Sequence, residues 1–287
     1  MFENMNSSVK NEKIAGLTFF FILSYALSWL YMIPSAMYSH NLLSNPPPTF
    51  LSYIAAYGPA LSSITTVIIF NKKEMGGVFS RIIIWRVHLK WYLIALLLQP
   101  AFMLVALGLS YLLNFAPDFE HAMIFTIGDA VTLENMFASL LPFLLLQMIS
   151  VLGEEIGWRG YALPTLLSSN GWFKSGLILG GLWAVWHVPL FITAGSVQSG
   201  MSPIWYFIDL MASSLIFVWL FLRTKGSVLI ATLLHASINT FAIFLPIVPM
   251  RGASLMPFII LVTLKWGFVA LIVFLQQLQK HVRYEKE

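Results

Sequence analysis

Two adjacent glutamates and an arginine lie where the surrounding sequence is almost entirely apolar. The stretch SVLGEEIGWRGYALP, residues 150–164, holds Glu154, Glu155 and Arg159. Residues four apart share one face of a helix, so Glu155 and Arg159 are expected to form an ion pair. Glu154 points about 100° away from that face and lacks this partner. We therefore expect Glu155 and Arg159 to form a structural pair and Glu154 to be free to act as a general base.

Two histidines on later apolar segments extend this chemistry. His187 follows Trp183 by four residues in WAVWHVP, and His235 precedes Asn239 by four residues in HASIN. Each pair therefore lies on one helical face. Pro189, just beyond His187, can kink the helix and open a polar pocket.

Ionisable groups in a membrane span are costly and usually face a bundle interior or a water-filled cavity. Asp209 is one more such group, and no neighbour in the sequence explains it. At 1.5 Å per residue from the cytoplasmic helix ends, His235 lies about 12 Å deep and His187 about 18 Å deep. Glu154 lies nearer the cytoplasmic mouth on this count. The three groups can then meet only in a cavity that opens to the cytoplasm.

The composition places these residues in a membrane protein. Of 287 residues, 59% are hydrophobic and 10% are charged, and the mean hydropathy is +0.81. Soluble domains carry about 25% charged residues. The chain has no cysteine, which excludes disulfides and cysteine-ligated metals. No basic stripe with interleaved aromatics is present, so nucleic acid is not an expected partner.

Apolar runs of about 20 residues, the length that crosses a bilayer as a helix, predict the architecture. We predict an all-α polytopic protein, with residues 1–287 as a single integral membrane domain. Eight spans are expected at 14–36, 51–70, 91–113, 136–157, 174–194, 203–222, 227–245 and 255–278.

The basic residues fit this span count. With eight spans, 14 of the 16 Lys and Arg fall on the side of the two termini, Arg159 among them. The loops of the other side hold only Arg251, and Lys265 lies within the last span. By the positive-inside rule both termini are cytoplasmic, in what we expect to be the plasma (cell) membrane.

Three motifs in order carry a family resemblance. GEEIGWRGYALP contains E-E-x-x-x-R, WAVWH ends in the histidine of an F-x-x-x-H-like motif, and HASIN is H-x-x-x-N. This ordered set resembles the CPBP family of intramembrane proteases, which includes type II CAAX prenyl endopeptidases, bacteriocin-processing and immunity proteins, and abortive-infection (Abi) proteins. It covers the expected catalytic core, residues 136–245. Trp183 stands where the family usually has phenylalanine, so we expect a reshaped pocket wall and assign Trp183 to substrate binding.

The resemblance implies an intramembrane endopeptidase with a conical cavity in the membrane, acting on membrane-associated or lipid-modified peptides. In its glutamate form, Glu154 with His187 activates a water, while His235 and Asn239 stabilise the oxyanion. The partners would be a peptide or lipid-modified protein and the membrane lipids. The implied catalytic residues are Glu154, Glu155, Arg159, His187, His235 and Asn239.

The resemblance also leaves a zinc enzyme open, with Glu154, His187 and His235 as ligands beside a water. H-E-x-x-H is absent, and the sequence shows no carboxylate that would orient either histidine. We favour the glutamate form.

Two alternatives lie outside catalysis. A family member that has lost activity would serve as a membrane binding or immunity protein. A proton- or ion-coupled transporter would also use intramembrane acids and histidines, but transporters often show two repeated halves. Here the charged groups cluster in the fourth to seventh spans, which favours a site built in one half.

Overall fold

A computed structural model describes residues 2–70, 72, 75–115, 133–248 and 254–284. These residues form helices joined by short connections, with no strand among them. Three of the basic residues used for orientation, Lys73, Arg251 and Lys286, lie outside this part of the chain. The longer helices are α1 (Phe2–Ser39), α2 (Phe50–Phe70), α4 (Leu89–Leu112), α6 (Leu133–Glu155), α8 (Trp172–Trp186), α10 (Pro203–Arg223), α11 (Val228–Phe244) and α12 (Met256–Tyr284). The short ones are α3 (Met75–Ile82), η2 (Ile156–Ala162), α7 (Leu163–Leu167), α9 (Val188–Phe191) and η3 (Val197–Gly200).

Each of the eight predicted spans coincides with an apolar helix. In the described chain six are long enough to cross a membrane: Asn11–Ser39, Phe50–Phe70, Leu89–Leu112, Ala138–Leu167, Pro203–Arg223 and Met256–Gln279. The apolar helix α11 is shorter, at 17 residues. Helix α8 has 15 residues and is followed by α9 after a break at His187. The predicted all-helical polytopic membrane protein is confirmed.

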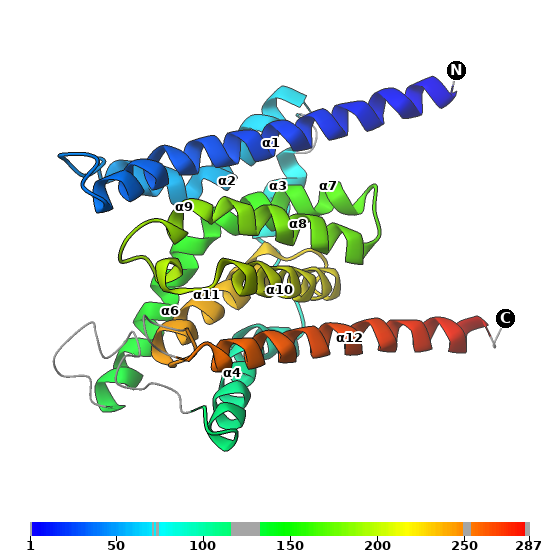
Figure 1. Cartoon of the computed structure of the whole chain (residues 1–287). Coiled ribbons are helices and arrows are strands. Elements are labelled where there is room, and N and C mark those ends of the chain that lie inside the picture. Colours follow the sequence, from blue (N-terminus) through cyan, green and yellow to red (C-terminus); the bar gives the residue numbers. More distant parts are fainter. Residues whose placement is uncertain (1, 71, 73–74, 116–132, 249–253, 285–287) are drawn as a thin grey trace.

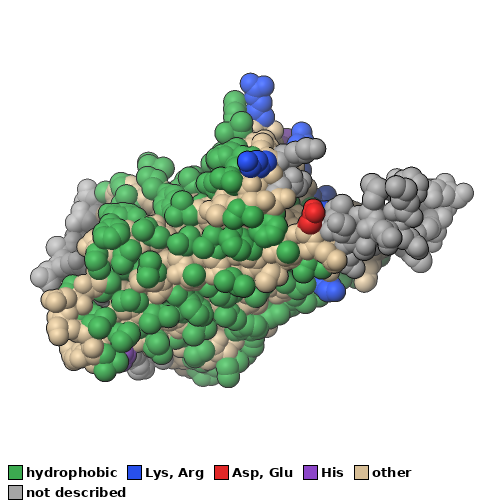
Figure 2. All heavy atoms as spheres, turned by 90° about the horizontal axis from the view of Figure 1, so that it is seen from above, with side chains coloured by type: hydrophobic (Ala, Val, Ile, Leu, Met, Phe, Trp, Pro, Cys, Tyr) green, Lys and Arg blue, Asp and Glu red, His purple; other side chains and the backbone are tan. Residues whose placement is uncertain are grey.

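The outer surface is suited to lipid. Large apolar side chains point outward on helices at both edges of the bundle, including Ile22, Leu104, Leu146 and Phe274, each more than half exposed. Figure 2 shows a broad face covered by hydrophobic side chains, with charged groups at only a few places. Soluble monomers rarely expose apolar patches of this extent.

The helices form a bundle in which α1 pairs with α2 along one edge and α12 packs on α4 and α10 along the other. Between them, α8 packs on α10, and α11 packs on both α4 and α6. Figure 1 shows the start of α1 and the end of α12 at the same end of the bundle. We call this the terminal end, and the end that carries α9 and η3 the opposite end.

The helix that carries the two glutamates is longer than predicted. The sequence placed the end of this span at residue 157, but α6 continues without a break through the π-helical η2 and α7 to Leu167. Segments of π-helix are rare and often occur at functional sites. Glu154 therefore lies 13 residues before the end of the continuous helix, about 20 Å along its axis.

Two glycines let α2 approach this helix closely. A Cβ atom on Gly153 would lie 2.6 Å from the carbonyl oxygen of Ala56, and one on Gly157 would lie 2.6 Å from that of Pro59. Backbones this close leave no room for a side chain. The glycines bracket Glu154 and Glu155, so α2 fixes the position of the turn that holds both acids.

Candidate active site

Glu155 joins two helices through one carboxylate oxygen. Its Oε1 accepts a hydrogen bond from Nη1 of Arg159 at 2.8 Å and another from Nδ1 of His235 at 2.8 Å. Glu155 and Arg159 are fully buried, and His235 is 5% exposed. The ion pair predicted from the four-residue spacing is therefore present. It also carries a role that the sequence did not show, because it orients the histidine of α11.

Arg159 lies in the protein core and not in a connecting loop. Its guanidinium carbon lies 4.4 Å from the ring centroid of Trp183 and 3.9 Å from that of Phe217. Aromatic faces attract a cation most strongly when it is removed from water. The sequence counted Arg159 among the cations beside the fourth span. Because the helix continues through η2 and α7 beyond Arg159, this buried residue does not belong among the cations at the membrane surface.

Glu154 has a different environment from its neighbour. It is partly exposed to the cavity described below, and its Oε2 accepts a hydrogen bond from the indole Nε1 of Trp183 at 2.9 Å. No ion pair joins Glu154 to a histidine within the described residues. Trp183 is 2% exposed and lies at the centre of the site, so it holds the carboxylate as well as forming part of the cavity wall.

His187 stands where α8 ends. It is the C-cap of that helix, and α9 begins at the next residue with Pro189 in its first turn. The backbone carbonyl of Trp183 lies 2.8 Å from Nδ1 of His187. A carbonyl only accepts, so Nδ1 carries the proton and Nε2 is left for other partners. The break expected near Pro189 is present at His187, two residues before the proline.

His235 and Asn239 share a face of α11, as their spacing predicted. Nδ1 of His235 donates to Glu155, so its Nε2 also remains available. Nδ2 of Asn239 donates to Oε1 of Gln147 on α6 at 3.2 Å, which uses one of its two N–H groups. Gln147 was not predicted. A polar residue in the middle of the fourth span was the signal that could have identified it.

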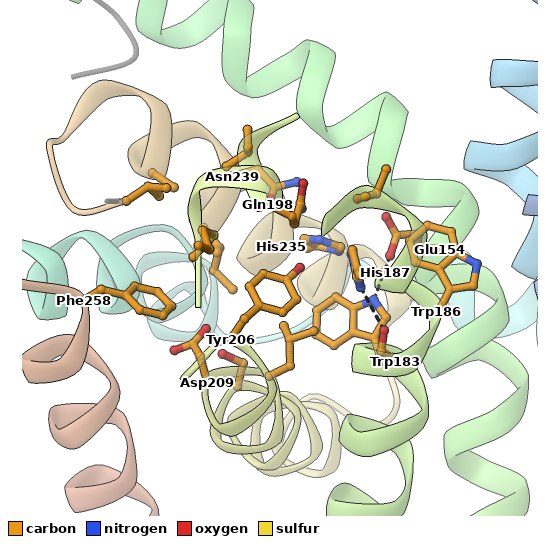
Figure 3. Close-up of a pocket in the computed structure, with 18 of the residues that line it drawn as sticks. Glu154, Trp183, Trp186, His187, Gln198, Tyr206, Asp209, His235, Asn239 and Phe258 are labelled. Carbon is orange, nitrogen blue, oxygen red and sulfur yellow. Dashed lines mark hydrogen bonds between the residues drawn. The ribbon is translucent and has the colours of Figure 1, made fainter. Parts of the chain in front are cut away.

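These groups line a single cavity of about 360 Å³. Glu154, His187, His235 and Asn239 all contribute to its wall, together with Trp183. Figure 3 shows Glu154, Trp183 and His187 close together at one side, with Asp209 and Phe258 at the other. Most of the remaining wall is apolar, from Met32, Trp186, Leu190, Ile238, Ile247 and Leu261. Cavities of this size and character hold small molecules or short peptide segments.

Asp209, which the sequence left without a partner, is paired with Lys265 of α12. Its carboxylate oxygens lie 2.8 and 3.0 Å from Nζ of Lys265, which also donates to Oγ of Ser213 at 3.1 Å. Two of the three N–H groups of the ammonium make hydrogen bonds, one to Oδ2 of Asp209 and one to Oγ of Ser213. Asp209 and Lys265 line the cavity but satisfy each other, so the pair is a structural link between α10 and α12.

The position of the cavity bears on two expectations. It lies towards the opposite end of the bundle, where residues of α9, η3 and the start of α12 form its wall. The sequence predicted cytoplasmic termini and a cavity open to the cytoplasm, whereas the cavity lies in the half of the bundle away from the termini. The prediction placed Glu154 near the terminal end because it ended the helix at residue 157. The continuation to Leu167 sets Glu154 deeper.

The zinc alternative can be compared with the positions of the side chains. A catalytic zinc needs three protein ligands gathered around one point. Among the residues that the structure describes, no group of three or more His, Asp or Glu could hold a metal ion. Glu154, His187 and His235 line one cavity without forming such a set. The sequence showed no carboxylate that would orient either histidine, but in the structure the carboxylate of Glu155 orients His235 through Nδ1.

Known proteins are similar to this chain in the segment that carries the three motifs. Residues 136–241 match the profile of the family described as type II CAAX prenyl endopeptidase Rce1-like. CAAX prenyl protease 2 of Methanococcus maripaludis is 30% identical over 159 residues, which cover 53% of this chain and 56% of that protein. The chain thus spans little more than half the length of this curated relative. The motif-bearing segment is therefore similar to the Rce1-like family of type II CAAX prenyl endopeptidases, in agreement with the resemblance of its three motifs to the CPBP family.

Proposed function

We propose that this protein is an intramembrane endopeptidase that uses Glu154 as the base for hydrolysis. The observation that carries the proposal is the shared cavity. A partly exposed carboxylate and two histidines, each held through Nδ1, line one mainly apolar space inside a membrane protein. The family of the segment 136–241 supports the same reaction class.

In this proposal a water molecule is held between Glu154 and Nε2 of His187. Glu154 removes a proton from that water as it attacks the carbonyl carbon of the peptide. The proton then passes to the leaving amine. The indole N–H of Trp183 fixes one oxygen of Glu154, so the other faces the water. Holding both groups before the substrate arrives lowers the entropic part of the barrier.

Stabilisation of the oxyanion falls to His235 and Asn239. Asn239 has a second N–H beyond the one given to Gln147. In this scheme His235 donates from Nε2 as the imidazolium, while Nδ1 is held by Glu155. Removing one such donor from an enzyme typically lowers kcat by about 10²–10³-fold. Glu155 and Arg159 act in this scheme by positioning His235.

The substrate is proposed to be a peptide with a hydrophobic or lipid-attached segment. The wall beyond the polar groups consists of aromatic and aliphatic side chains, which favour an apolar segment next to the scissile bond. The relative named CAAX prenyl protease 2 supports a lipid-modified peptide. The surrounding apolar surface supports this proposal, because a membrane that anchors such a substrate would also hold this protein.

The test is Glu154→Gln in the purified full chain, assayed with a lipidated fluorogenic peptide. We expect loss of cleavage by at least about 10³-fold, because the amide cannot accept the proton of water, with the melting temperature lowered by no more than about 4 °C. Glu12→Gln, an exposed glutamate at the terminal end, is the matched control and should cleave normally. Cleavage by Glu154→Gln at the normal rate would refute the assignment.

A second measurement separates the glutamate form from the zinc form. Purified protein is analysed for bound metal and then assayed after treatment with a chelator. The glutamate form predicts unchanged cleavage. Stoichiometric zinc, with activity lost on its removal and restored on its return, would overturn the glutamate form.

A further inference from the structure

The cavity lies in one half of the membrane bundle. Helix α1 begins at the terminal end and contributes Tyr31 and Met32, close to its other end. Helix α12 runs back towards the terminal end and contributes Phe258, Leu261 and Lys265, close to its start. The part of the wall farthest from the termini consists of loop and η3 residues, and Val197, Gln198 and Val248 there are partly exposed.

Packed side chains close the cavity towards the terminal end. Trp158, Arg159, Phe217, Ile230 and Leu234 lie on that side of the site and are at most 1% exposed. The described residues also line a smaller cavity of about 200 Å³ at the terminal end, between α1, α2, α3 and α7. It shares no lining residue with the larger one. A peptide that approached from the terminal end would have to pass through this packed layer.

The basic residues orient the bundle. Removal of the buried Arg159 leaves 13 of the 14 cations that the sequence placed at the terminal end. The connecting segments at the opposite end contain no Lys or Arg among the residues that the structure describes. Lys265 belongs to neither group, because it is buried against Asp209. By the positive-inside rule this asymmetry places the terminal end in the cytoplasm, and the cavity then faces away from it.

We infer that the active-site cavity receives its substrate from the extracytoplasmic side of the membrane. The ligand class is a peptide with an apolar or lipid-attached segment held in the outer leaflet, and not a soluble protein of the cytoplasm. That the ligand is a substrate rests on the proposed function. The side on which the cavity opens rests only on the fold and on the distribution of charge.

Cysteine labelling tests the orientation directly, because the chain has no cysteine of its own. Ala194→Cys places one thiol in an exposed loop at the opposite end, and Ser169→Cys places one in an exposed loop at the terminal end. Intact cells are treated with a charged maleimide that does not cross membranes. We expect Ala194→Cys to be labelled in intact cells and Ser169→Cys only after permeabilisation. The reverse pattern would overturn the inference.

An activity measurement then tests access. A lipidated fluorogenic peptide with a charged, impermeant reporter is added to right-side-out and to inside-out membrane vesicles. We expect cleavage at least about tenfold faster in right-side-out vesicles, and loss of it in Glu154→Gln. Faster cleavage in inside-out vesicles would overturn the inference. Cleavage in neither would count against the proposed function, while labelling would still decide on which side the cavity opens.

Discussion

Replacing Glu155 by glutamine should destabilise the protein strongly, although the two side chains have nearly the same shape. Glu155 is the anion that a buried guanidinium and a buried histidine share. Removing one partner of a buried ion pair costs about 3–5 kcal/mol. The amide oxygen still accepts, and two rings still face Arg159, which retains about 1 kcal/mol. We therefore expect Glu155→Gln to lower the free energy of unfolding by about 2–4 kcal/mol.

The assay is reversible unfolding in mixed micelles, followed by tryptophan fluorescence and circular dichroism. Glu154→Gln is the matched control, one residue away. Glu154 is partly exposed and makes a hydrogen bond to Trp183 in place of an ion pair. Its loss should therefore be smaller, below about 1.5 kcal/mol. The comparison needs no substrate, so it tests the packing of the site independently of catalysis.

A double-mutant cycle sharpens the result. Arg159→Met removes the cation and keeps a long apolar side chain between the rings of Trp183 and Phe217. Combining it with Glu155→Gln should cost less than the sum of the single changes, by about 2 kcal/mol, because no unpaired charge then remains buried. Additive losses, or a loss below 1 kcal/mol for Glu155→Gln, would refute the reasoning.

Two further predictions follow from other contacts. Trp183→Phe removes the indole N–H that donates to Glu154 and keeps an aromatic ring. We expect kcat/KM for peptide cleavage to fall about tenfold, equivalent to about 1.4 kcal/mol, with little change in melting temperature. An unchanged rate would show that this hydrogen bond does not position the carboxylate. Gly157→Ala should lower the free energy of unfolding by about 1–3 kcal/mol because its Cβ would collide with Pro59. Gly108→Ala on α4 is the control, because a Cβ there would meet nothing within 4 Å. It should leave the free energy of unfolding unchanged or raise it by up to about 1 kcal/mol. Equal effects at the two glycines would contradict the close approach of α2 to the helix at Gly157.

Periodicity and apolar length identified much of the fold, because each membrane helix leaves a local signal. All eight predicted spans coincide with helices, and the ion pair between Glu155 and Arg159 follows from a spacing within one helix. The largest error concerned the end of the fourth span. The prediction ended this helix at residue 157, whereas the backbone continues as π-helix over Ile156–Ala162.

The contacts between helices could not be predicted in the same way. His235 is 80 residues from Glu155, and Lys265 is 56 residues from Asp209. Each of these four residues was visible as a charged or titratable group in an apolar segment. Which of them meet depends on the order in which the helices pack, and spacing along the chain carries no information about that order. The side on which the cavity opens depends on it too.

The ion pair within one helix has a consequence for how the protein is made. Glu155 and Arg159 are synthesised four residues apart, so their charges are neutralised as soon as their helix forms. His235 follows 80 residues after Glu155, about 4–16 s later at 5–20 residues per second. During that interval the fourth span can remain in the bilayer at low cost, before His235 has been synthesised. The proposed active site would therefore be assembled late, and a chain cut short before α11 would lack His235 and Asn239.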